Sequence, residues 1–485
     1  MQVVFVASEM VPFATTGGLG DVLGSLPEEI AKFGHKVSVF LPKYKKISQK
    51  GFTLEPIGKE IHVPIGSEVE TANIFSCRLG ELKVFFVGHA DYFERDELYG
   101  TPMGDYPDND RRFTFFQRAV LEALKQLKIK PDIIHCHDWQ TGLIPVYLKT
   151  LYQGDPFFKK TRTLFTIHNL AYQGNFPPDS VPLTGLSWDE FRLERLEFYG
   201  KISFLKGGLI YADVLTTVSQ RYAQEIQTQG FGCGLEAVLS KRRGDLTGIV
   251  NGINPSEWDS EKDKEIEANF GARELEGKTA CKRALQKENH LSVDPKVPVF
   301  GFVGRLADQK GLDILAPVVE EMAKANWQLV LLGTGEEEYH KMLRILQKRH
   351  PQHLGLNITF DAKIAKRIYS GADIFLAPSR YEPCGLGPMF SLRFGTIPIV
   401  RETGGFVDTV REFNPRTGQG NGFIFSGYQS EDLLATMHRA VGVYQNQKVW
   451  TKLMRNGMEC DFSWESSARR YAALYERAER KSIQV

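Results

Sequence analysis

Residues 2–41 read QVVFVASEMVPFATTGGLGDVLGSLPEEIAKFGHKVSVFL, and this stretch sets the fold class. The apolar run 3–7 predicts a strand that is buried on both faces. A glycine turn at 16–20 follows, then apolar residues at helical spacing from 22 to 33, and a second strand at 36–41. Pro27 must either kink this helix or lie in the first turn of a segment capped by Ser25. A strand–helix–strand crossover of this kind builds a parallel sheet, so the class is α/β.

The same pattern continues in two series of strands. Each strand precedes a polar or glycine-containing turn and a helical pattern, and the strands are expected at 132–135, 163–167, 213–217, 298–303, 328–332, 373–376 and 397–400. Residues 255–296 between the series are charged and weakly patterned, which predicts a hinge close after Ile253. We therefore expect two doubly wound, Rossmann-like domains, 1–253 and 254–464, that face one another across a deep cleft.

Composition excludes several classes of function. The 485 residues carry 60 Lys+Arg against 59 Asp+Glu, a net charge of +1, so electrostatics favours neither a nucleic acid nor an anionic membrane as partner. No uncharged apolar run reaches the roughly 18 residues that a spanning helix needs. The six cysteines lie far apart without a CxxC pair, and the first residues show no signal-peptide core. We expect reduced thiols and a cytoplasmic protein.

Polar residues follow the strands of the first series, where open α/β sheets bind ligands. The turn GGLG (17–20) lacks the dinucleotide fingerprint and alone predicts only a tight turn. His135 and His137 resemble metal ligands, but they share one strand face without an evident third ligand, which favours a core histidine and a strand-end polar cluster. Asp138 and Trp139 suit a sugar, as a carboxylate for hydroxyls and a ring for a pyranose face. His168, with Asn169 beside it, is suited to binding hydroxyls.

The strand ends of the second series carry charge. Arg305 and Lys310 lie five residues apart around a strand-to-helix turn and suit a diphosphate, although a solvated basic loop explains them about equally well. Glu382 precedes a proline and a glycine, which fix its backbone. The turn 403–405 offers a hydroxyl and backbone N–H groups that suit an anion. Several such turns after successive strands are not well explained by chance.

These residues belong to longer stretches that resemble bacterial glycogen synthases and plant starch synthases, glycosyltransferase family 5. The stretches occur in family order and spacing: 8–27, 135–148 (HCHDWQTGLIPVYL), 166–174 (TIHNLAYQG), 204–219, 231–239, 251–254, 304–313 (GRLADQKGLD), 379–405 and 462–471. The set covers both halves of the chain and is highly specific, although no single stretch is.

The resemblance implies a GT-B fold whose C-terminal helix, about 465–485, crosses back to the first domain. It implies transfer of glucose from a nucleotide-glucose, with ADP-glucose favoured, to the non-reducing end of an α-1,4-glucan with retention, and without a metal or other cofactor. The implied catalytic residues are His168, Arg305, Lys310 and Glu382. The implied donor contacts are Thr15, Gly17, Gly18, Asn169, Phe360, Cys384, Gly385, Leu386, Thr403, Gly404 and Gly405. Glu9, Asp138 and Trp139 are the implied acceptor or sugar contacts.

Two departures from the family pattern bear on the donor. Thr15 stands where the family has a lysine near the donor phosphates, and Pro388 removes a backbone N–H. These departures leave UDP-glucose as an alternative donor and a non-catalytic glucan-binding homologue as an alternative function. A pyridoxal-phosphate phosphorylase and an NAD enzyme lack their motifs. Phe390 stands where some related retaining transferases have an acid, so we expect front-face displacement rather than a covalent glucosyl-enzyme.

Overall fold

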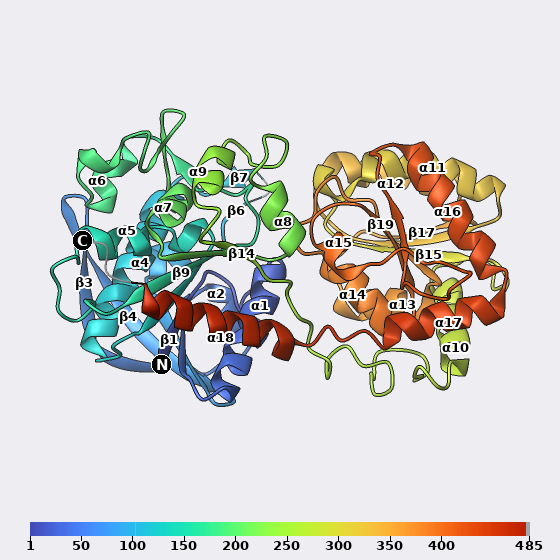
Figure 1. Cartoon of the computed structure of the whole chain (residues 1–485), viewed down its shortest axis with the longest axis horizontal. Coiled ribbons are helices and arrows are strands. Elements are labelled where there is room, and N and C mark those ends of the chain that lie inside the picture. Colours follow the sequence, from blue (N-terminus) through green and yellow to red (C-terminus); the bar gives the residue numbers. More distant parts are fainter. Residues whose placement is uncertain (102, 482–485) are drawn as a thin grey trace. The chain divides into compact units, whose positions relative to one another are not determined.

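The computed structural model describes residues 1–101 and 103–481, which divide into two compact units (Figure 1). Unit 1 comprises Met1–Val218, Ala223–Gly252 and the chain from Trp464 onward. Unit 2 comprises Ser219–Tyr222 and Ile253–Ser463.

Unit 1 is built on a nine-stranded sheet with the order β14-β13-β9-β8-β1-β2-β5-β4-β3. The strands from β14 to β5 are parallel, and β4 and β3 continue the sheet antiparallel. The strands are β1 (Gln2–Val6), β2 (Lys36–Pro42), β3 (Glu55–Ile65), β4 (Glu68–Leu79), β5 (Leu82–Gly88), β8 (Ile133–His137), β9 (Arg162–Ile167), β13 (Val214–Thr217) and β14 (Leu246–Gly248). Short strands form two further small sheets: β6 (Gly100–Thr101) with β7 (Gly104–Asp105), and β10 (Asn175–Phe176), β12 (Lys201–Ser203) and β11 (Glu197–Phe198).

Helices follow most parallel strands of unit 1, as the crossover pattern predicts. The helices before residue 253 are α1 (Gly18–Lys32), α2 (Lys45–Gln49), α3 (Ala90–Phe93), α4 (Asn109–Gln126), α5 (Leu143–Lys149), α6 (Ser180–Thr184), α7 (Phe204–Tyr211), α8 (Gln220–Glu225) and α9 (Glu236–Lys241), with the 3-10 turns η1 (Trp139–Thr141) and η2 (Trp188–Glu190). Helix α1 continues through Pro27, which excludes a new helix start at Ser25.

The C-terminal helix α18 (Trp464–Arg480) belongs to unit 1, which confirms the expected return of the chain. Its side chains hydrogen-bond to unit 1: Ser467 Oγ donates to the Val250 carbonyl at 2.6 Å, and Arg470 donates to the Gly248 carbonyl at 2.8 Å. The fully buried Tyr475 reaches β8. Figure 1 shows α18 beside α1 in this unit. The last residues of the predicted helix, 482–485, lie outside the described residues.

Unit 2 contains a six-stranded parallel sheet with the order β17-β16-β15-β18-β19-β20. Alternate residues of β16 join different cores, Leu329 and Leu331 one cluster and Val330 and Leu332 another, so the sheet is buried on both faces. Its strands are β15 (Val299–Val303), β16 (Gln328–Leu332), β17 (Leu354–Asn357), β18 (Ile374–Ala377), β19 (Ile397–Arg401) and β20 (Phe423–Phe425). Its helices are α10 (Glu276–Glu288), η3 (Asp308–Lys310), α11 (Leu312–Lys324), α12 (Glu337–Arg349), α13 (Ala362–Gly371), α14 (Leu386–Arg393), α15 (Gly405–Thr409), α16 (Ser430–Tyr444) and α17 (Gln447–Met458).

All nine strands that the sequence predicts are present, with ends that differ by one or two residues. The α/β class and the two Rossmann-like sheets are confirmed. Within residues 1–101 and 103–481, no helix is both long and apolar enough to cross a membrane.

Candidate active site

Each sheet has one point where the strand order reverses direction, and open α/β sheets bind ligands there, at the carboxyl ends of the strands. In unit 1 this point lies between β1 and β8, and in unit 2 between β15 and β18. The predicted residues follow these strands. Glu9 comes after β1, Asp138 after β8, Lys310 after β15 and Glu382 after β18.

Opposite charges meet at the switch point of unit 2. Lys310 Nζ lies 2.6 Å from Glu382 Oε2, and Ser379 Oγ donates to the same oxygen at 3.0 Å. The side chain of Glu382 is 10% exposed and that of Lys310 is 26% exposed. The two loops are also joined by backbone, because Arg380 N donates to the Gln309 carbonyl at 2.8 Å. The structure thus brings together two charged groups that stand 72 residues apart.

Glycines allow a third loop, residues 403–405, to pack closely against the backbone of Glu382. A Cβ at Gly404 (φ +46°) would lie 1.8 Å from the Glu382 carbonyl oxygen, and a Cβ at Gly405 would lie 1.9 Å from the Cys384 carbonyl oxygen. Gly385 has φ +79° and packs against the Phe406 ring. These positions require glycine because any side chain would clash with a neighbouring backbone or ring.

Two backbone N–H groups that were expected to serve an anion are already used within unit 2. Gly405 N donates to the Glu382 carbonyl at 3.1 Å, and Thr403 N donates to the Arg401 carbonyl at 2.8 Å. These hydrogen bonds fix the shape of the loop beside Glu382, and the anion contact expected at 403–405 stays a prediction.

The remaining donor-contact candidates of unit 2 lie on the same sheet edge. Arg305 is exposed after β15, and Phe360 is 82% exposed after β17. Cys384 and Leu386 flank Gly385, which caps α14. Pro388 lies in the first turn of α14, where a helix loses no internal hydrogen bond to a missing N–H.

In unit 1, Glu9 organises the turn before α1. Its carboxylate accepts Thr16 Oγ1 at 2.7 Å, Thr16 N at 2.5 Å, and the Tyr99 hydroxyl at 2.7 Å. Glu9 is 4% exposed. Both of its oxygens are therefore engaged, so Glu9 shapes the turn, and its contact with a sugar stays a prediction.

Glu9 also reaches the N-terminus of α1, because its Oε2 accepts the backbone N–H of Gly17 at 3.3 Å. Gly17 and Gly18 are exposed, and Gly17 is the N-cap without a side-chain cap. No atom of the described residues comes within 4 Å of the point where a Cβ on Gly17 would lie. The Thr15 hydroxyl donates to the Gly17 carbonyl at 3.1 Å. A helix N-terminus of this kind favours an anion.

Asp138 connects the ends of β8 and β9. Its Oδ1 accepts the backbone N–H of His168 at 2.7 Å. Burial raises the pKa of Asp138 to about 7, while backbone N–H groups of His168 and Asn169 act in the opposite direction. Asp138 has φ +57° and ψ −175°, a backbone region that is normally reserved for glycine and is costly elsewhere. The strand ends hold this residue in a strained conformation.

Three histidines pack beside Asp138. His135 and His137 on β8 stack with ring centroids 4.1 Å apart, and His137 Nδ1 lies 2.9 Å from His168 Nε2. Burial lowers the pKa of His168 to about 3 and the pKa values of His135 and His137 well below their usual range. All three imidazoles are therefore neutral near pH 7. Among the described residues, no group of three or more His, Cys, Asp or Glu side chains could hold a metal ion.

Two further unit 1 candidates have structural contacts. Trp139 is 8% exposed and packs between Phe113 and Gly174, where a Cβ would lie 2.5 Å from its ring. The core thus covers most of the Trp139 ring, and its contact with a sugar stays a prediction. Asn169 is half-buried, and its side-chain oxygen accepts the backbone N–H of Ala171 at 3.1 Å.

Three hydrogen-bond partners of these residues are not among the predicted site residues. Tyr99 hydrogen-bonds to Glu9 from 90 residues away, so no local signal points to it. Ser379 could be found as the polar residue that first follows β18. His137 has the sequence signal of a core histidine, although its i+2 spacing from His135 places both on one face of the strand.

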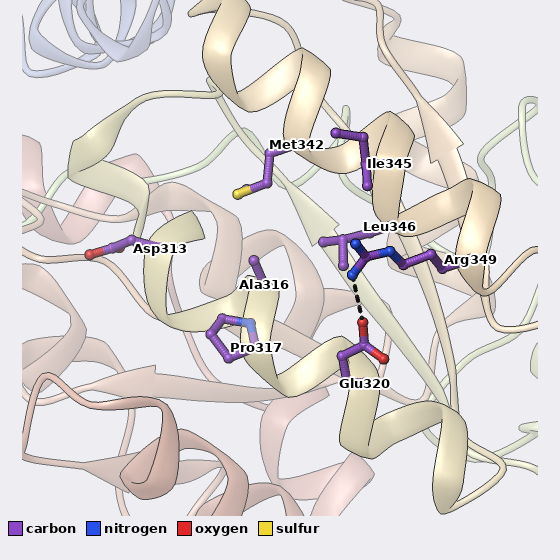
Figure 2. Close-up of a pocket in the computed structure, with 8 residues that line it drawn as sticks. All are labelled: Asp313, Ala316, Pro317, Glu320, Met342, Ile345, Leu346 and Arg349. Carbon is purple, nitrogen blue, oxygen red and sulfur yellow. Dashed lines mark hydrogen bonds and ion pairs between the residues drawn. The ribbon is translucent and has the colours of Figure 1, made fainter.

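A separate groove lies between α11 and α12 in unit 2 (Figure 2). It encloses about 650 Å³ and contains none of the predicted site residues. Figure 2 shows an apolar wall of Ala316, Pro317 and Leu346 with Glu320 and Arg349 at one end. The strand-end residues, and not this groove, carry the polar groups that chemistry requires.

Comparison with known proteins agrees with this geometry. Residues 2–241 match the family model for the starch synthase catalytic domain, and residues 285–453 match that for glycosyl transferases group 1. The catalytic domain of starch synthase IV from Arabidopsis thaliana, bound to ADP and acarbose, matches with a TM-score of 0.92 at 32% identity over 99% of both chains. A sucrose-phosphate synthase from Thermosynechococcus elongatus, at 18% identity and TM-score 0.61 over 98% and 99% of the two chains, shares the fold.

Fold and sheet-edge residues thus define a glycosyltransferase of the GT-B fold. Glycogen synthases from Koribacter versatilis and Geotalea daltonii are 47% and 46% identical over 99% and 98% of this chain and 98% of theirs. The chain belongs to the glycogen synthase family, and it is an enzyme.

Proposed function

We propose that this enzyme transfers glucose from ADP-glucose to the non-reducing end of an α-1,4-glucan with retention of configuration. The observation that carries the proposal is the Lys310–Glu382 pair at the switch point of unit 2. A cation that converges with a carboxylate at this point suits a nucleotide-sugar, which has a diphosphate on one side of the anomeric carbon and a positively charged ring in the transition state on the other.

We assign the donor side to unit 2. Arg305 and Lys310 neutralise the departing diphosphate, a role in which no metal is needed. Glu382 contacts the glucosyl ring and stabilises its oxocarbenium-like character. Phe360 stacks on the nucleobase, since its ring is exposed at the carboxyl end of β17. The starch synthase IV structure, whose ligands are ADP and acarbose, supports ADP as the nucleotide.

We assign the sugar side to unit 1. Neutral His168 and the buried carboxyl of Asp138 are suited to bind hydroxyls, since sugar oxygens both donate and accept hydrogen bonds. The exposed turn at Gly17 and Gly18 lies on the donor side in this assignment, with the Gly17 N–H donated to Glu9. The three neutral imidazoles keep the strand ends of β8 and β9 free of positive charge, which suits an uncharged glucan acceptor.

Displacement takes place on one face of the glucosyl ring. The bond between C1 and the phosphate oxygen breaks, a bond from C1 to the acceptor 4-oxygen forms, and the 4-hydroxyl proton moves to the leaving phosphate oxygen. Phe390 packs flat on Trp258, with ring centroids 3.7 Å apart, so this position supplies no second carboxylate for a covalent intermediate. A trapped glucosyl adduct on any carboxylate would overturn this mechanism.

The test is nucleotide release in the presence of a glycogen primer, with ADP-glucose and UDP-glucose compared side by side. We expect faster release from ADP-glucose and α-linked extension of the primer. Faster release from UDP-glucose would overturn the donor assignment and point to Thr15 and Pro388. Release from neither, by folded protein, would favour a non-catalytic glucan-binding homologue. The cytoplasmic location stays a prediction.

A further inference from the structure

A hydrogen bond joins the two rings that lie nearest the strand-end carboxyl of unit 1. His137 Nδ1 and His168 Nε2 are 2.9 Å apart, and their ring centroids are 5.2 Å apart. His137 is buried and His168 is half-buried. Since both imidazoles are neutral, one nitrogen of the pair carries the proton and the other accepts it. The position of this proton decides which nitrogen His168 presents as a donor.

The surroundings of His137 decide between the two arrangements. His137 is fully buried, and its Nε2 has no hydrogen-bond partner among the described residues. A proton on Nε2 would leave a buried N–H without an acceptor, whereas an unpaired acceptor nitrogen is tolerated more often. The proton of His137 therefore belongs on Nδ1, from which it is donated to His168 Nε2. His168 then carries its own proton on Nδ1.

Packing holds the His137 ring in this orientation. Phe5 stacks on it at 5.9 Å between ring centroids, and His135 stacks on it at 4.1 Å. His135 is itself fixed on both sides, since its Nδ1 lies 2.8 Å from the Tyr475 hydroxyl and its Nε2 lies 2.6 Å from Thr166 Oγ1. The ring that contacts His168 thus has little freedom to turn.

We infer that His137 is a positioning residue for His168, a role that rests on the proposed glucosyl transfer: it fixes His168 as a neutral Nδ1–H donor. A neutral donor suits an oxygen of the sugar or of its leaving group and takes no proton from the acceptor. The titratable groups that surround the pair are His135 on β8, Asp138 after β8 and, acting through Asp138, Glu9 after β1.

Two matched substitutions at two matched sites test the role. His137→Phe fills the space without a hydrogen bond, and His137→Asn restores an amide near the Nδ1 position. His89→Phe and His89→Asn are the controls, because the His89 ring is also packed in unit 1, and its contacts with Glu70, Tyr92 and Phe115 include none of the site candidates. We expect His137→Phe to lower kcat about tenfold or more, the value of one well-oriented hydrogen bond, with donor KM nearly unchanged.

His137→Asn should recover most of that loss, and the His89 variants should lose thermal stability while the kcat of the folded enzyme is kept. An equal kcat in His137→Phe and His89→Phe, or no recovery in His137→Asn, would overturn the positioning role. A second measurement covers variants that fail to fold: ¹⁵N spectra of histidine-labelled native enzyme, with His168 assigned through His168→Asn.

The spectra should show His168 protonated at Nδ1 and unprotonated at Nε2. A proton on Nε2 would contradict the inference whatever the kinetics. This readout also separates two failures. If the native enzyme transfers no glucose, the proposed function fails while the spectra still test the hydrogen bond; if it transfers glucose and the variants match their controls, only the role of His137 fails.

Discussion

The two units place their candidate residues at equivalent points of their sheets, but the side chains are charged in unit 2 and mostly neutral in unit 1. Both place their candidate residues after the strands that flank a switch point of a parallel sheet. Unit 2 places an ion pair there, Lys310 with Glu382. Unit 1 places neutral imidazoles and the Asp138 carboxyl there. Burial raises the pKa of this carboxyl to about 7.

Burial explains why the chemistry differs. In unit 2 each charge has an opposite partner within hydrogen-bond distance, so both charges persist in a largely buried site. In unit 1 the described partners of the Asp138 carboxyl are backbone N–H groups rather than cations, and desolvation favours the uncharged forms of the three histidines. Whether a buried group at these sheet edges stays charged thus depends on whether it has an oppositely charged partner. The edge of unit 2 suits a diphosphate, and the edge of unit 1 suits hydroxyls.

The largest expected effect comes from breaking the ion pair of unit 2. Lys310→Ala removes a charge that would stabilise the leaving diphosphate, and it leaves the buried Glu382 without its cation. We expect kcat to fall about 100- to 1,000-fold, as for the loss of one preorganised electrostatic group. Initial rates of nucleotide release measure this. Lys324→Ala is the control, since Lys324 pairs with Glu321 but its side chain is 71% exposed; equal rates in the two variants would remove Lys310 from the site.

Gly404→Ala tests the packing that supports the same edge. The added Cβ would lie 1.8 Å from the Glu382 carbonyl oxygen at a backbone φ of +46°. We expect a loss of about 2 kcal/mol or more in the free energy of unfolding, together with lower activity. Gly442→Ala, in α16 with nothing described within 4 Å of its Cβ, should instead stabilise by up to about 1 kcal/mol. Urea unfolding compares the stabilities of the two variants. Equal midpoints would mean that the loop at Gly404 can move to accommodate the added Cβ without loss of stability.

The neutral edge of unit 1 predicts a particular pH dependence. The lowered pKa of His168 means that the unfolded chain binds more protons below pH 6.5, so stability falls as pH falls toward 3, by about 1.4 kcal/mol from pH 7.5 to 5.5 for one such histidine. Asp138 acts in the opposite direction. Its raised pKa of about 7 means that the folded chain binds more protons between pH 3.8 and 7, so its contribution is lost as pH rises through 7.

Asp138→Asn should therefore make the loss of stability between pH 7.5 and 5.5 steeper by about 1–2 kcal/mol, because the opposing contribution is gone. Urea midpoints at the two pH values check this. Asp96→Asn, an exposed carboxyl that pairs with Lys45, is the control and should not steepen the loss. An unchanged loss in Asp138→Asn would show that Asp138 is ionised in the folded enzyme over this pH range.

The smallest effect is expected at Thr15. A lysine there returns a cation to the exposed turn beside Gly17 and Gly18, and we expect a two- to fivefold lower donor KM, about 0.5–1 kcal/mol for a half-exposed ion pair. Thr15→Gln has similar length without charge and should leave KM unchanged. A higher KM in Thr15→Lys than in Thr15→Gln would mean that the turn does not face the donor.

The local pattern of apolar residues predicts the fold better than it predicts the contacts within the site. Buried parallel strands such as β16 have continuous apolar sequences, so their positions follow from the sequence alone. Strands β3 and β4 are not predicted, because one face of each is largely exposed and the apolar alternation is broken. The antiparallel extension of the sheet they form carries none of the predicted site residues.

Within the site, the sequence locates residues but not their partners. Glu382 and Lys310 can be placed at strand ends, yet their contact spans 72 residues and depends on the strand order. The sequence does not predict that Trp139 is packed in the core, because a buried ring and a sugar-stacking ring have the same sequence signal. The contact with Gly174 distinguishes them, and only the structure shows it.

The most direct test of the contrast between the two edges is equilibrium binding of ADP, measured by calorimetry on four proteins: the native enzyme, Lys310→Ala, Arg305→Ala and His168→Ala. We expect both cation variants to bind ADP more weakly, and His168→Ala to bind ADP like the native enzyme but to have lost glucosyl transfer. ADP affinity that falls in His168→Ala and is kept in Lys310→Ala would contradict the assignment of the donor diphosphate to unit 2.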